Sequence, residues 1–464
     1  MNIHGIEVNC KNKPLYDKDF IPFSKFTEEF EKSVETTGGK KIAIALYGNG
    51  ETIYVSKISI HKDGFLDANR FYVERMVKFL LWMKGGWKVA ICGDKSIAEF
   101  ISDTYRKGGA REFDAEFMAS IYNHPFEVVS LPYDDMPVSR ETNMSVGGNL
   151  NGYRIGFDAG GSDRKVSAII DGRTVFSEET VWNPKLNSDL NYHYSGIMES
   201  LKKAASYLPQ VDAIGVSSAG IFFDNKCMIA SLFLKVPKDV FEKEAKNIYQ
   251  RAAREINPKA PVMVCNDGDV AALAGSMSLR KNSLLGIAMG TSEAAGFVDE
   301  NGNIKGWLNE LAFAPVNVGP KGTIDEWSGD IGCGVKYLSQ DAVVKLCPIA
   351  GIDLQADATP AQKLRAVQEL VEVGDGRAHR VFSSIGVYLG HGLAQYYKMY
   401  SMKQVLLLGR VMSGAGGNII LRTAEKVLKE EYPNIAENLK LNLPDEKSRL
   451  VGQSVAAASL PVLE

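Results

Sequence analysis

The stretch YRIGFDAGGSDRKVSAIIDG, residues 153–172, decides the fold of this chain. An apolar run ends at Asp158, a turn follows at Gly160, Gly161 and Ser162, and a second apolar run leads to a closing Asp-Gly pair. This order predicts a β-hairpin, because Asp-Gly is a strong turn signal between two strands. Glycines at the tip let backbone N–H groups approach an anion without a side chain in the way. The stretch therefore predicts a hairpin that can bind phosphate.

Three side chains of this hairpin suit phosphate and its metal. Ser162 and Lys165 offer a hydroxyl and a cation, and Asp158 is placed to hold a magnesium ion through water. An ordinary hairpin with a charged tip has the same composition. On this segment alone, both interpretations stay open.

The overall composition is that of a soluble globular protein. The chain has 464 residues, 45% hydrophobic and 23% charged, and this length predicts two or three domains. Its net charge is −3, from 53 basic and 56 acidic residues without a long run of either sign. That balance argues against nucleic acid as the main partner.

The sequence also predicts a cytoplasmic protein that does not enter a membrane. Its first residues lack the apolar core of a signal peptide. The most apolar helix candidate, residues 71–84, is interrupted by Glu74, Arg75 and Lys78. Six cysteines without a CxxC pair predict reduced thiols and build no zinc or iron–sulfur site. They are Cys10, Cys92, Cys227, Cys265, Cys333 and Cys347.

Residues 1–135 predict a separate small α/β domain, and the turn-rich residues 136–152 predict a linker. Within the domain, Asp67 is placed to cap a helix with an apolar stripe. The domain's function cannot be inferred from its residues. The expected strands and helices cover residues 41–47, 52–60, 67–84, 87–92, 96–106, 114–122 and 126–131.

Two later strands end in residues that could face a ligand. Residues 213–216 lead to the small residues Ser218 and Gly220, and residues 262–265 run into Asn266-Asp267-Gly268. A carboxylate at the C-terminal end of a strand is well placed to act as a general base. The alternative is that Asp267 merely caps the following helix. Taken alone, this segment favours the cap.

A second hairpin of the same design is expected at residues 284–302, with Gly290, Thr291 and Ser292 at its tip. The recurrence indicates an internally duplicated fold with one phosphate-binding hairpin in each lobe. A long helix, residues 379–400, then precedes a strand, the glycine-rich turn 409–417 and another helix. Strand, turn and helix form a nucleotide-binding geometry, because a helix N-terminus offers free N–H groups.

This order of parts resembles the ROK family (repressors, open reading frames, kinases) of the actin/hexokinase/Hsp70 ATPase superfamily. The resemblance covers residues 153–464. The quoted DAGGS at Asp158 is similar to the first phosphate motif, DxGGT, although two residues are inserted before Lys165 as in BadF-type ATPases. Asn266-Asp267-Gly268 is similar to the start of NDxNAAAL. Gly290-Thr291 matches the start of the second phosphate motif, GTG, and residues 409–417 and 451–458 resemble the adenosine-binding glycines and the closing helix.

The resemblance implies a two-lobed actin-like/ribonuclease H-like α/β fold, with lobes at residues 153–280 and 281–464, preceded by the small α/β domain. It implies an ATP-dependent sugar kinase that uses ATP and Mg²⁺, with Asp267 as the catalytic base. The implied substrate-binding residues are Ser218, Gly220, Asn266, Asp267 and Glu310. The implied cofactor-binding residues are Asp158, Gly160, Gly161, Ser162, Lys165, Gly290, Thr291, Ser292, Gly409, Gly414, Gly416 and Gly417.

The acceptor side departs from the family pattern. Phe313 stands where the family has a histidine that contacts sugar or zinc, and Val335 replaces a sugar-binding glutamate. Cys333 alone remains of three thiolates, so no structural zinc is expected. Glu326 and Asp330 could replace the lost contacts, but ordinary loop charges are the favoured interpretation. The acceptor is therefore not necessarily glucose.

Three other functions remain open at this level. They are a non-catalytic sugar-sensing regulator, a BadF-type ATPase that acts on a partner protein, and a scaffold whose kinase site has decayed. The expected partner is a small-molecule sugar, with a homodimer as an open option. The sequence does not reveal the sugar or the role of residues 1–135.

Overall fold

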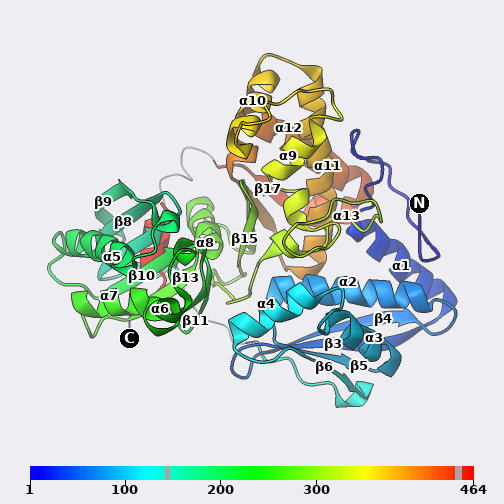
Figure 1. Ribbon diagram of the computed structural model, residues 1–464, viewed down its shortest axis with the longest axis horizontal. Coiled ribbons are helices and arrows are strands. Elements are labelled where there is room, and N and C mark those ends of the chain that lie inside the picture. Colours follow the sequence, from blue (N-terminus) through cyan, green and yellow to red (C-terminus); the bar gives the residue numbers. More distant parts are fainter. Residues whose placement is uncertain (142–146, 445–451, 464) are drawn as a thin grey trace. The chain divides into compact units, whose positions relative to one another are not determined.

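The computed structural model describes residues 1–141, 147–444 and 452–463, and it divides into two compact units (Figure 1). Both units combine segments that are far apart in the sequence. Unit 1 consists of Met1–Thr142, Ile287–Ala294 and Trp307–Leu443. Unit 2 consists of Asn143–Gly286, Ala295–Gly306 and Pro444–Glu464.

Unit 2 is built on a five-stranded sheet with the order β13-β10-β7-β8-β9. The first three strands in sequence form an antiparallel meander, and β10 and β13 extend it as parallel neighbours of β7. The predicted hairpin is therefore β7 and β8, with Asp158 directly opposite Lys165. The strands are β7 Tyr153–Ala159, β8 Asp163–Ile170, β9 Arg173–Val181, β10 Ala213–Ser218 and β13 Val262–Asn266.

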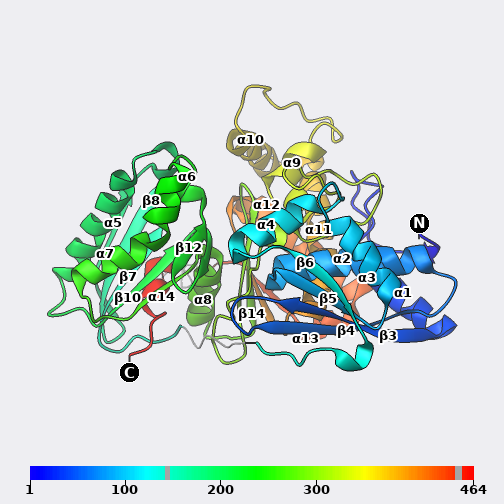
Figure 2. The same ribbon diagram turned by 60° about the horizontal axis from the view of Figure 1, so that its bottom comes forward.

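Helices cover both faces of this sheet (Figure 2). Helices α5, Leu190–Ala205, and α7, Ile248–Ile256, pack on each other over one face. Helices α8, Asp267–Leu279, and α14, Gln453–Ala458, pack together at the other face. Ile155 and Phe157 belong to the core under α5 and α7, because alternate residues of a strand point to opposite faces.

The glycine at position 156 allows α14 to lie directly on the sheet. A Cβ added to Gly156 would come within 1.7 Å of the backbone oxygen of Ser454. Any larger side chain would therefore push the helix away. The closing helix expected at residues 451–458 is confirmed from Gln453 onward, while position 451 lies outside the described residues.

The first part of unit 1 is a four-stranded sheet with the order β4-β3-β5-β6. β3 pairs antiparallel with β4 and β5, and β5 pairs parallel with β6. The expected elements are present, but the predicted cap at Asp67 is wrong, because the helix begins at Leu66 and Phe65 precedes it without a side-chain cap. The elements are β3 Gly39–Tyr47, β4 Ile53–His61, α2 Leu66–Lys84, β5 Lys88–Cys92, α3 Lys95–Tyr105, α4 Glu112–Tyr122 and β6 Glu127–Leu131.

Helix α2 is buried on more than one side. Its charged residues Glu74, Arg75 and Lys78 are buried together with the apolar residues around them. Buried charged side chains require partners of opposite charge. Helix α2 therefore lies inside unit 1, between the sheet and other segments of the chain.

The second part of unit 1 contains the paired helices α11 and α12 and most of the sheet β15-β14-β16-β17, of which residues 284–286 and 295–298 are assigned to unit 2. Helix α1, Phe23–Thr37, packs on α11 and was not expected, although its buried Phe23, Phe26 and Phe30 have helical spacing. The elements are β14 Leu284–Met289, β15 Glu293–Val298, α9 Gln340–Leu346, α10 Pro360–Glu372, α11 Gly376–Met399, β16 Gln404–Leu408, α12 Gly414–Glu431, α13 Pro433–Asn438 and β17 Lys440–Asn442.

Residues 1–135 and most of the second predicted lobe lie together in unit 1. The backbone N–H of Phe23 donates to the carbonyl of Val316 over 2.9 Å, and Ile21 N donates to Asn317 Oδ1 over 2.9 Å. The two units thus divide the chain differently from the expected domains 1–135, 153–280 and 281–464, which stay a proposal. Across the described residues, no helix combines the length and apolar character needed to span a membrane.

Candidate functional site

Asp158, at the end of β7, is buried next to a serine of the neighbouring strand. Ser217 Oγ donates a hydrogen bond to Asp158 Oδ1 over 2.7 Å. Gln453, the first residue of α14, donates from Nε2 to Ser217 Oγ over 3.2 Å and to the backbone oxygen of Asp267 over 2.8 Å. Gln453 therefore connects the two carboxylate positions. In the sequence, Gln453 has no signal beyond being a long polar side chain at the start of a helix of small residues.

The tip of the first hairpin is open to solvent. Gly161 and Ser162 are exposed, and Trp182 holds the turn by donating from Nε1 to the Gly160 carbonyl over 2.8 Å and from N to the Ser162 carbonyl over 3.1 Å. Trp182 thus fixes the backbone of the predicted phosphate-binding tip, while Gly161 and Ser162 stay accessible to solvent. Lys165, on the following strand, lies 3.7 Å from the nearest carboxylate oxygens.

A second cation at this tip was missed by the sequence analysis. A Cβ added to Gly161 would lie 3.2 Å from Nζ of Lys185, which belongs to a one-turn helix, Pro184–Leu186. Burial raises the pKa of Asp267, and the charge of Lys185 acts in the opposite direction. No local sequence pattern distinguishes Lys185 from other exposed lysines, because only the fold brings it to the tip.

Asp267 begins α8, but it does not cap that helix. Asn266 is the cap: its Oδ1 accepts from Gly268 N over 2.7 Å, compared with 3.0 Å to Asp267 Oδ1. The Nδ2 of Asn266 donates to the Gly220 carbonyl over 2.8 Å. The alternative of a helix cap therefore does not account for Asp267. Both polar atoms of Asn266 already have partners, so this side chain orients the local backbone.

The two carboxylates of unit 2 are harder to ionise than ordinary aspartates. Burial raises the pKa of Asp158 to about 6, against a hydrogen bond from Ser217 that lowers it, and the charge of Asp267 contributes to the rise. Burial also raises the pKa of Asp267, against the N–H of Gly268. Raised carboxyl pKa values are typical of functional sites, because a bound cation or a transferred proton relieves the cost of the charge.

Of the other residues predicted in unit 2, Ser218 is turned inward. It is fully buried, and its hydroxyl lies 2.8 Å from the hydroxyl of Tyr249. Gly220 has a positive φ of 141° and lies against Ile229, whose oxygen would be 2.4 Å from an added Cβ. Ser218 therefore packs inside the unit, and the role of both residues in substrate binding stays a prediction.

The second predicted tip joins β14 and β15. Gly290 N donates to the Ser292 carbonyl over 3.0 Å, and Gln340 N donates to the Gly290 carbonyl over 2.9 Å. Thr291 and Ser292 are exposed. The tip therefore has a fixed backbone and presents two hydroxyl-bearing residues to solvent, and its role in binding phosphate stays a prediction.

A buried carboxyl group follows this tip directly. Glu293 is 2% exposed; its Oε1 accepts from Tyr396 over 3.1 Å, and its Oε2 has no hydrogen-bond partner among the described residues. Burial raises the pKa of Glu293 to about 8, against the hydrogen bond from Tyr396. Glu293 is therefore harder to ionise than an ordinary glutamate.

The glycine-rich turn after β16 lies against β14. Gly409 has a positive φ of 92°, and a Cβ there would come within 2.4 Å of the Met289 oxygen. The start of α12 is less open than predicted, because Ala415 N donates to Glu372 Oε1 over 3.2 Å. Glu372 thus occupies one N–H group that was expected to be free for a nucleotide. Gly414, Gly416 and Gly417 belong to this first turn.

Glu310 lies on a segment that α2 holds. Its backbone N–H donates to the Trp82 carbonyl over 2.9 Å, and the N–H of Asn309 donates to the Met83 carbonyl over 2.9 Å. Phe313, three residues further on, stacks on Trp82 with ring centroids 4.3 Å apart. Phe313, at the position of a histidine in the family pattern, thus makes an aromatic contact with Trp82 of the N-terminal segment.

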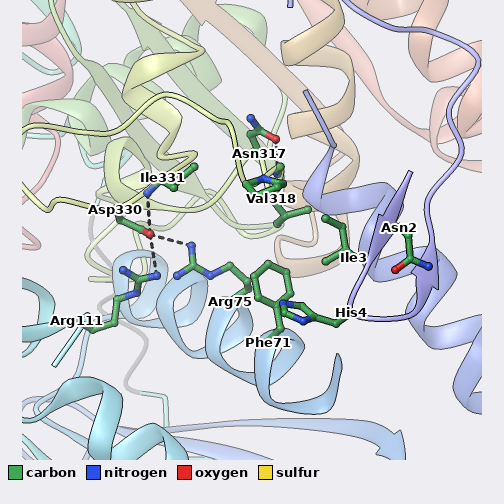
Figure 3. A pocket seen from close by; sticks show the side chains of 12 residues that line it. Asn2, Ile3, His4, Phe71, Arg75, Arg111, Asn317, Val318, Asp330 and Ile331 are labelled. Carbon is green, nitrogen blue, oxygen red and sulfur yellow. Dashed lines mark hydrogen bonds and ion pairs between the residues drawn. The ribbon is translucent and has the colours of Figure 1, made fainter. Parts of the chain in front are cut away.

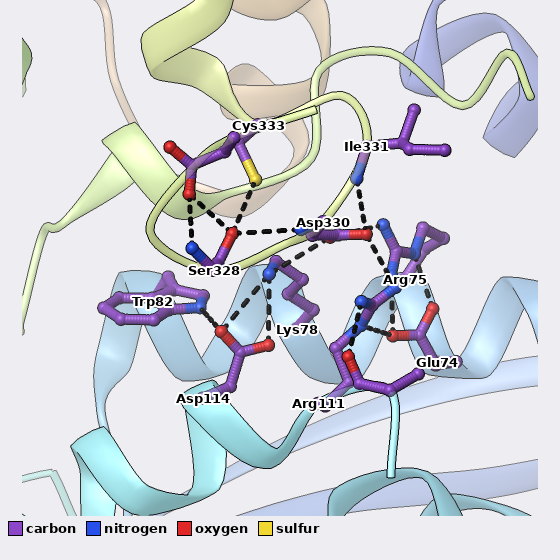
Figure 4. A network of polar contacts seen from close by, with 12 residues as sticks. Glu74, Arg75, Lys78, Trp82, Arg111, Asp114, Ser328, Asp330, Ile331 and Cys333 are labelled. Carbon is purple, nitrogen blue, oxygen red and sulfur yellow. Dashed lines mark hydrogen bonds and ion pairs between the residues drawn. The ribbon is translucent and has the colours of Figure 1, made fainter. Parts of the chain in front are cut away.

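The interpretation of Asp330 as an ordinary loop charge is wrong. Asp330 is buried and pairs with Arg75, Lys78 and Arg111 (Figure 4). Glu326, in contrast, is exposed and pairs with Lys336. Cys333 is buried, with its sulfur 3.6 Å from Ser328 Oγ. Among the residues that the structure describes, no group of three or more His, Cys, Asp or Glu is placed to hold a metal ion.

A cavity of about 320 Å³ adjoins this ion-pair network (Figure 3). Ile3, His4 and Phe71 line one side, and Arg75 and Arg111 line the other. Both guanidinium groups are already paired with carboxylates. The cavity therefore offers no unbalanced charge for an anionic ligand.

Comparisons with solved structures identify the fold. A ROK hexokinase from Thermus thermophilus matches 66% of this chain and 98% of its own length, with a TM-score of 0.51 and 18% identity. A ROK family transcriptional regulator, a homologue of the MLC protein of E. coli, matches 67% of this chain and 78% of its own, with a TM-score of 0.52 and 17% identity. No family model and no curated protein matches the sequence.

At these identities the likeness establishes the fold and nothing finer. The chain has the α/β fold of these ROK proteins, and the resemblance seen in the sequence is confirmed at that level. About a third of the chain lies outside the match, which agrees with an additional segment. Sugar kinases and a transcriptional regulator share this fold, so function has to be argued from the residues.

Proposed function

We propose that this protein is an ATP-dependent kinase that transfers the γ-phosphate of MgATP to a hydroxyl group of a sugar or sugar derivative. Asp267 carries this proposal. It stands at the C-terminal end of β13, has a raised pKa, and leaves the capping of α8 to Asn266. A carboxylate in that position can accept the proton of an acceptor hydroxyl.

The residues of unit 2 fit the magnesium salt of a nucleotide. Magnesium prefers oxygen ligands and retains several waters, and it would neutralise charge on the phosphates during transfer. Asp158 supplies a buried carboxylate whose raised pKa marks an unrelieved cost of ionisation. The exposed tip at Gly161 and Ser162, with Lys165 and Lys185 beside it, supplies N–H groups and cations for phosphate oxygens.

The remaining roles are assigned by their place in each unit. In unit 1, the tip at Thr291 and Ser292 would hold phosphate, and the turn at Gly409 would hold the adenosine. Glu310 would accept hydrogen bonds from the acceptor's hydroxyls. Because Phe313 and Val335 replace a histidine and a glutamate of the family pattern, the acceptor's identity stays open within the class of sugars and their derivatives.

One alternative has specific support. The fold is shared with a ROK family transcriptional regulator, and Phe313 cannot make the polar contact of the histidine in the family pattern. A protein that binds a sugar without phosphorylating it is therefore the second candidate. It predicts ligand-dependent stabilisation without turnover.

The test is ATP consumption by the purified protein with magnesium and a panel of hexoses, amino sugars, sugar acids and pentoses. Asp267→Asn should bind ligands nearly normally and lose about two to four orders of magnitude in turnover, the usual contribution of a general base. Asp239→Asn, an exposed aspartate of unit 2, is the matched control and should retain full activity.

Each outcome has a distinct meaning. A sugar-dependent rate that Asp267→Asn removes supports the kinase and names its acceptor class. ATP hydrolysis that no sugar changes would favour an ATPase acting on a partner. Sugar-dependent thermal stabilisation without ATP consumption would favour the sensor. In the last two cases the kinase proposal fails.

A further inference from the structure

The carboxyl end of α2 binds the segment that carries Glu310. The last carbonyl groups of a helix have no partner inside the helix. In α2, the carbonyls of Trp82 and Met83 accept from the N–H groups of Glu310 and Asn309, each over 2.9 Å. The backbone of the predicted acceptor segment is thus fixed by a helix from the start of the chain.

Aromatic packing reinforces this attachment. Trp82 stacks on Phe313 with centroids 4.3 Å apart, and Phe113 of α4 lies 5.6 Å from the same ring. The indole N–H of Trp82 donates to Asp114 Oδ1 over 3.0 Å, so its orientation is set by a polar contact as well. Aromatic pairs of this kind add about 0.5–1.5 kcal/mol beyond the burial of their surface.

A buried ion-pair network attaches a second segment to the same helix (Figure 4). Asp330 Oδ2 lies 2.9 Å from Arg75 Nη1 and 3.1 Å from Lys78 Nζ, and its Oδ1 lies 2.8 Å from Arg111 Nη2. We call this network the α2 charge cluster. It consists of Glu74, Arg75, Lys78, Arg111, Asp114 and Asp330.

The α2 charge cluster is electrically balanced, with three carboxylates and three cations. Burial alone would raise the pKa of Asp330, but Arg75, Lys78 and Arg111 outweigh burial and hold this pKa well below its ordinary range. Removing one partner from such a network leaves an uncompensated buried charge and is strongly destabilising. The cluster therefore fixes Asp330 firmly to α2.

The segment around Asp330 is in turn joined to the segment of Glu310. Val316 N donates to the carbonyl of Gly332 over 2.9 Å, and Gly334 N donates to the carbonyl of Ala314 over 2.9 Å. Residues 309–316 and 325–334 thus form one layer that α2 holds at two places. This layer contains the region that resembles the family's cysteine-rich segment but keeps only Cys333 of its three thiolates.

We propose that Asp330 and Trp82 are positioning residues that set the acceptor segment of Glu310, with the α2 charge cluster holding the loop of Asp330 against α2. This inference rests on the proposed function, because it assigns residues 309–316 to the acceptor. It gives residues 1–135 a definite role. Helix α2 is the element on which the acceptor segment packs.

The test uses a variant that keeps the cluster neutral. Asp330→Asn combined with Arg111→Gln removes one charge of each sign and leaves Glu74 paired with Arg75 and Asp114 paired with Lys78. Amide hydrogen exchange at Asn309 and Glu310 should become at least tenfold faster. Glu326→Gln, which removes an exposed carboxylate of the same loop, is the matched control and should stay within twofold of the parent.

Kinetics provide the second readout. In the double variant, KM for the acceptor should rise tenfold or more, while KM for ATP stays within twofold. Unchanged exchange at Asn309 and Glu310 in a folded double variant would overturn the inference, whatever the activity. A parent protein without any sugar-dependent turnover would instead defeat the proposed function, and the exchange experiment would still decide whether α2 supports this segment.

Discussion

At the scale of single residues, the pH dependence of folding stability shows whether the carboxylate of Asp158 has a functional or a structural role. Its pKa is raised to about 6, so the folded state binds this proton more tightly than the unfolded state does. Its contribution to stability is therefore greatest below about pH 4 and declines as the pH rises toward 6. Magnesium binding needs the opposite, ionised form.

We therefore expect an acidic limb near pH 6 in kcat/KM for ATP. Asp158→Asn should abolish the magnesium-dependent rate and yet raise the free energy of unfolding at pH 7 by roughly 2–3 kcal/mol, since one pKa unit corresponds to about 1.4 kcal/mol. Urea unfolding at pH 5 and pH 7 measures the stability. Equal loss of stability at both pH values would show that the carboxylate is needed for folding.

Residue-level prediction from sequence succeeded where the chemistry is local. The turn residues at Gly160 and Gly290 identify both hairpin tips, since glycine-rich turns have a direct physical signature. Lys185 and Gln453 gave no such signal. Their importance depends on contacts with residues more than twenty positions away, which no local pattern encodes.

At the scale of elements, the packing of α14 on the sheet of unit 2 depends on Gly156. Gly156→Ala places a Cβ 1.7 Å from the Ser454 oxygen, which neither backbone can accommodate without moving. We expect a loss of about 2–3 kcal/mol in the free energy of unfolding, in the range of overpacking mutations. Displacing α14 would also move Gln453 away from Asp267, so turnover should fall.

Chemical denaturation and the sugar-dependent rate measure these two effects together. Gly376→Ala at the start of α11 is the matched control, because the atom nearest to its added Cβ is Arg380 Nη1 at 3.5 Å. A Gly156→Ala protein as stable as the control would contradict the direct packing of helix on sheet.

For helix α2, the bounds were easier to predict from the sequence than the contacts that its side chains make. Its bounds follow from the apolar stripe and the glycines that end it. Its charged residues Glu74, Arg75 and Lys78 are buried, although charges on a helix are usually solvated. Asp330, which pairs with Arg75 and Lys78, lies 255 positions beyond Arg75. Pairing over such a distance leaves no periodic pattern in the sequence.

At the scale of the whole molecule, the first 141 residues are expected to be indispensable for solubility. Aromatic contacts join them to the rest of unit 1, among them those between Phe20 and Tyr388, Phe79 and Tyr396, and Trp82 and Phe313. Removing residues 1–141 would expose these ring partners, and each buried aromatic side chain contributes about 1.5–3 kcal/mol.

The shortened chain should therefore aggregate or lack a cooperative thermal transition. Size-exclusion chromatography and differential scanning calorimetry of residues 142–464 measure this, with a deletion of residues 1–9 alone as the control for loss of the terminus. A soluble shortened chain that melts cooperatively would mean that residues 1–135 form the detachable domain expected from the sequence.

The fold itself was predictable because its parts repeat a simple order of strand, turn and strand. How residues 1–135 pack on later segments of the chain could not be predicted, since local patterns describe a domain's elements but not the surface on which it packs. The acceptor side is the clearest example. Phe313 looked like a lost ligand in the sequence, whereas in the structure it is the partner of Trp82.

The division into two units has a consequence for how the chain responds to cutting. The backbone passes between the units at residues 142, 286, 294, 306 and 443. A protease that nicks any one of these passages leaves the units connected by the other four. A nicked protein should then migrate as two fragments under denaturing conditions and yet elute intact from a native column. Cleavage of one peptide bond therefore does not separate the two units, as it would if a single linker joined them.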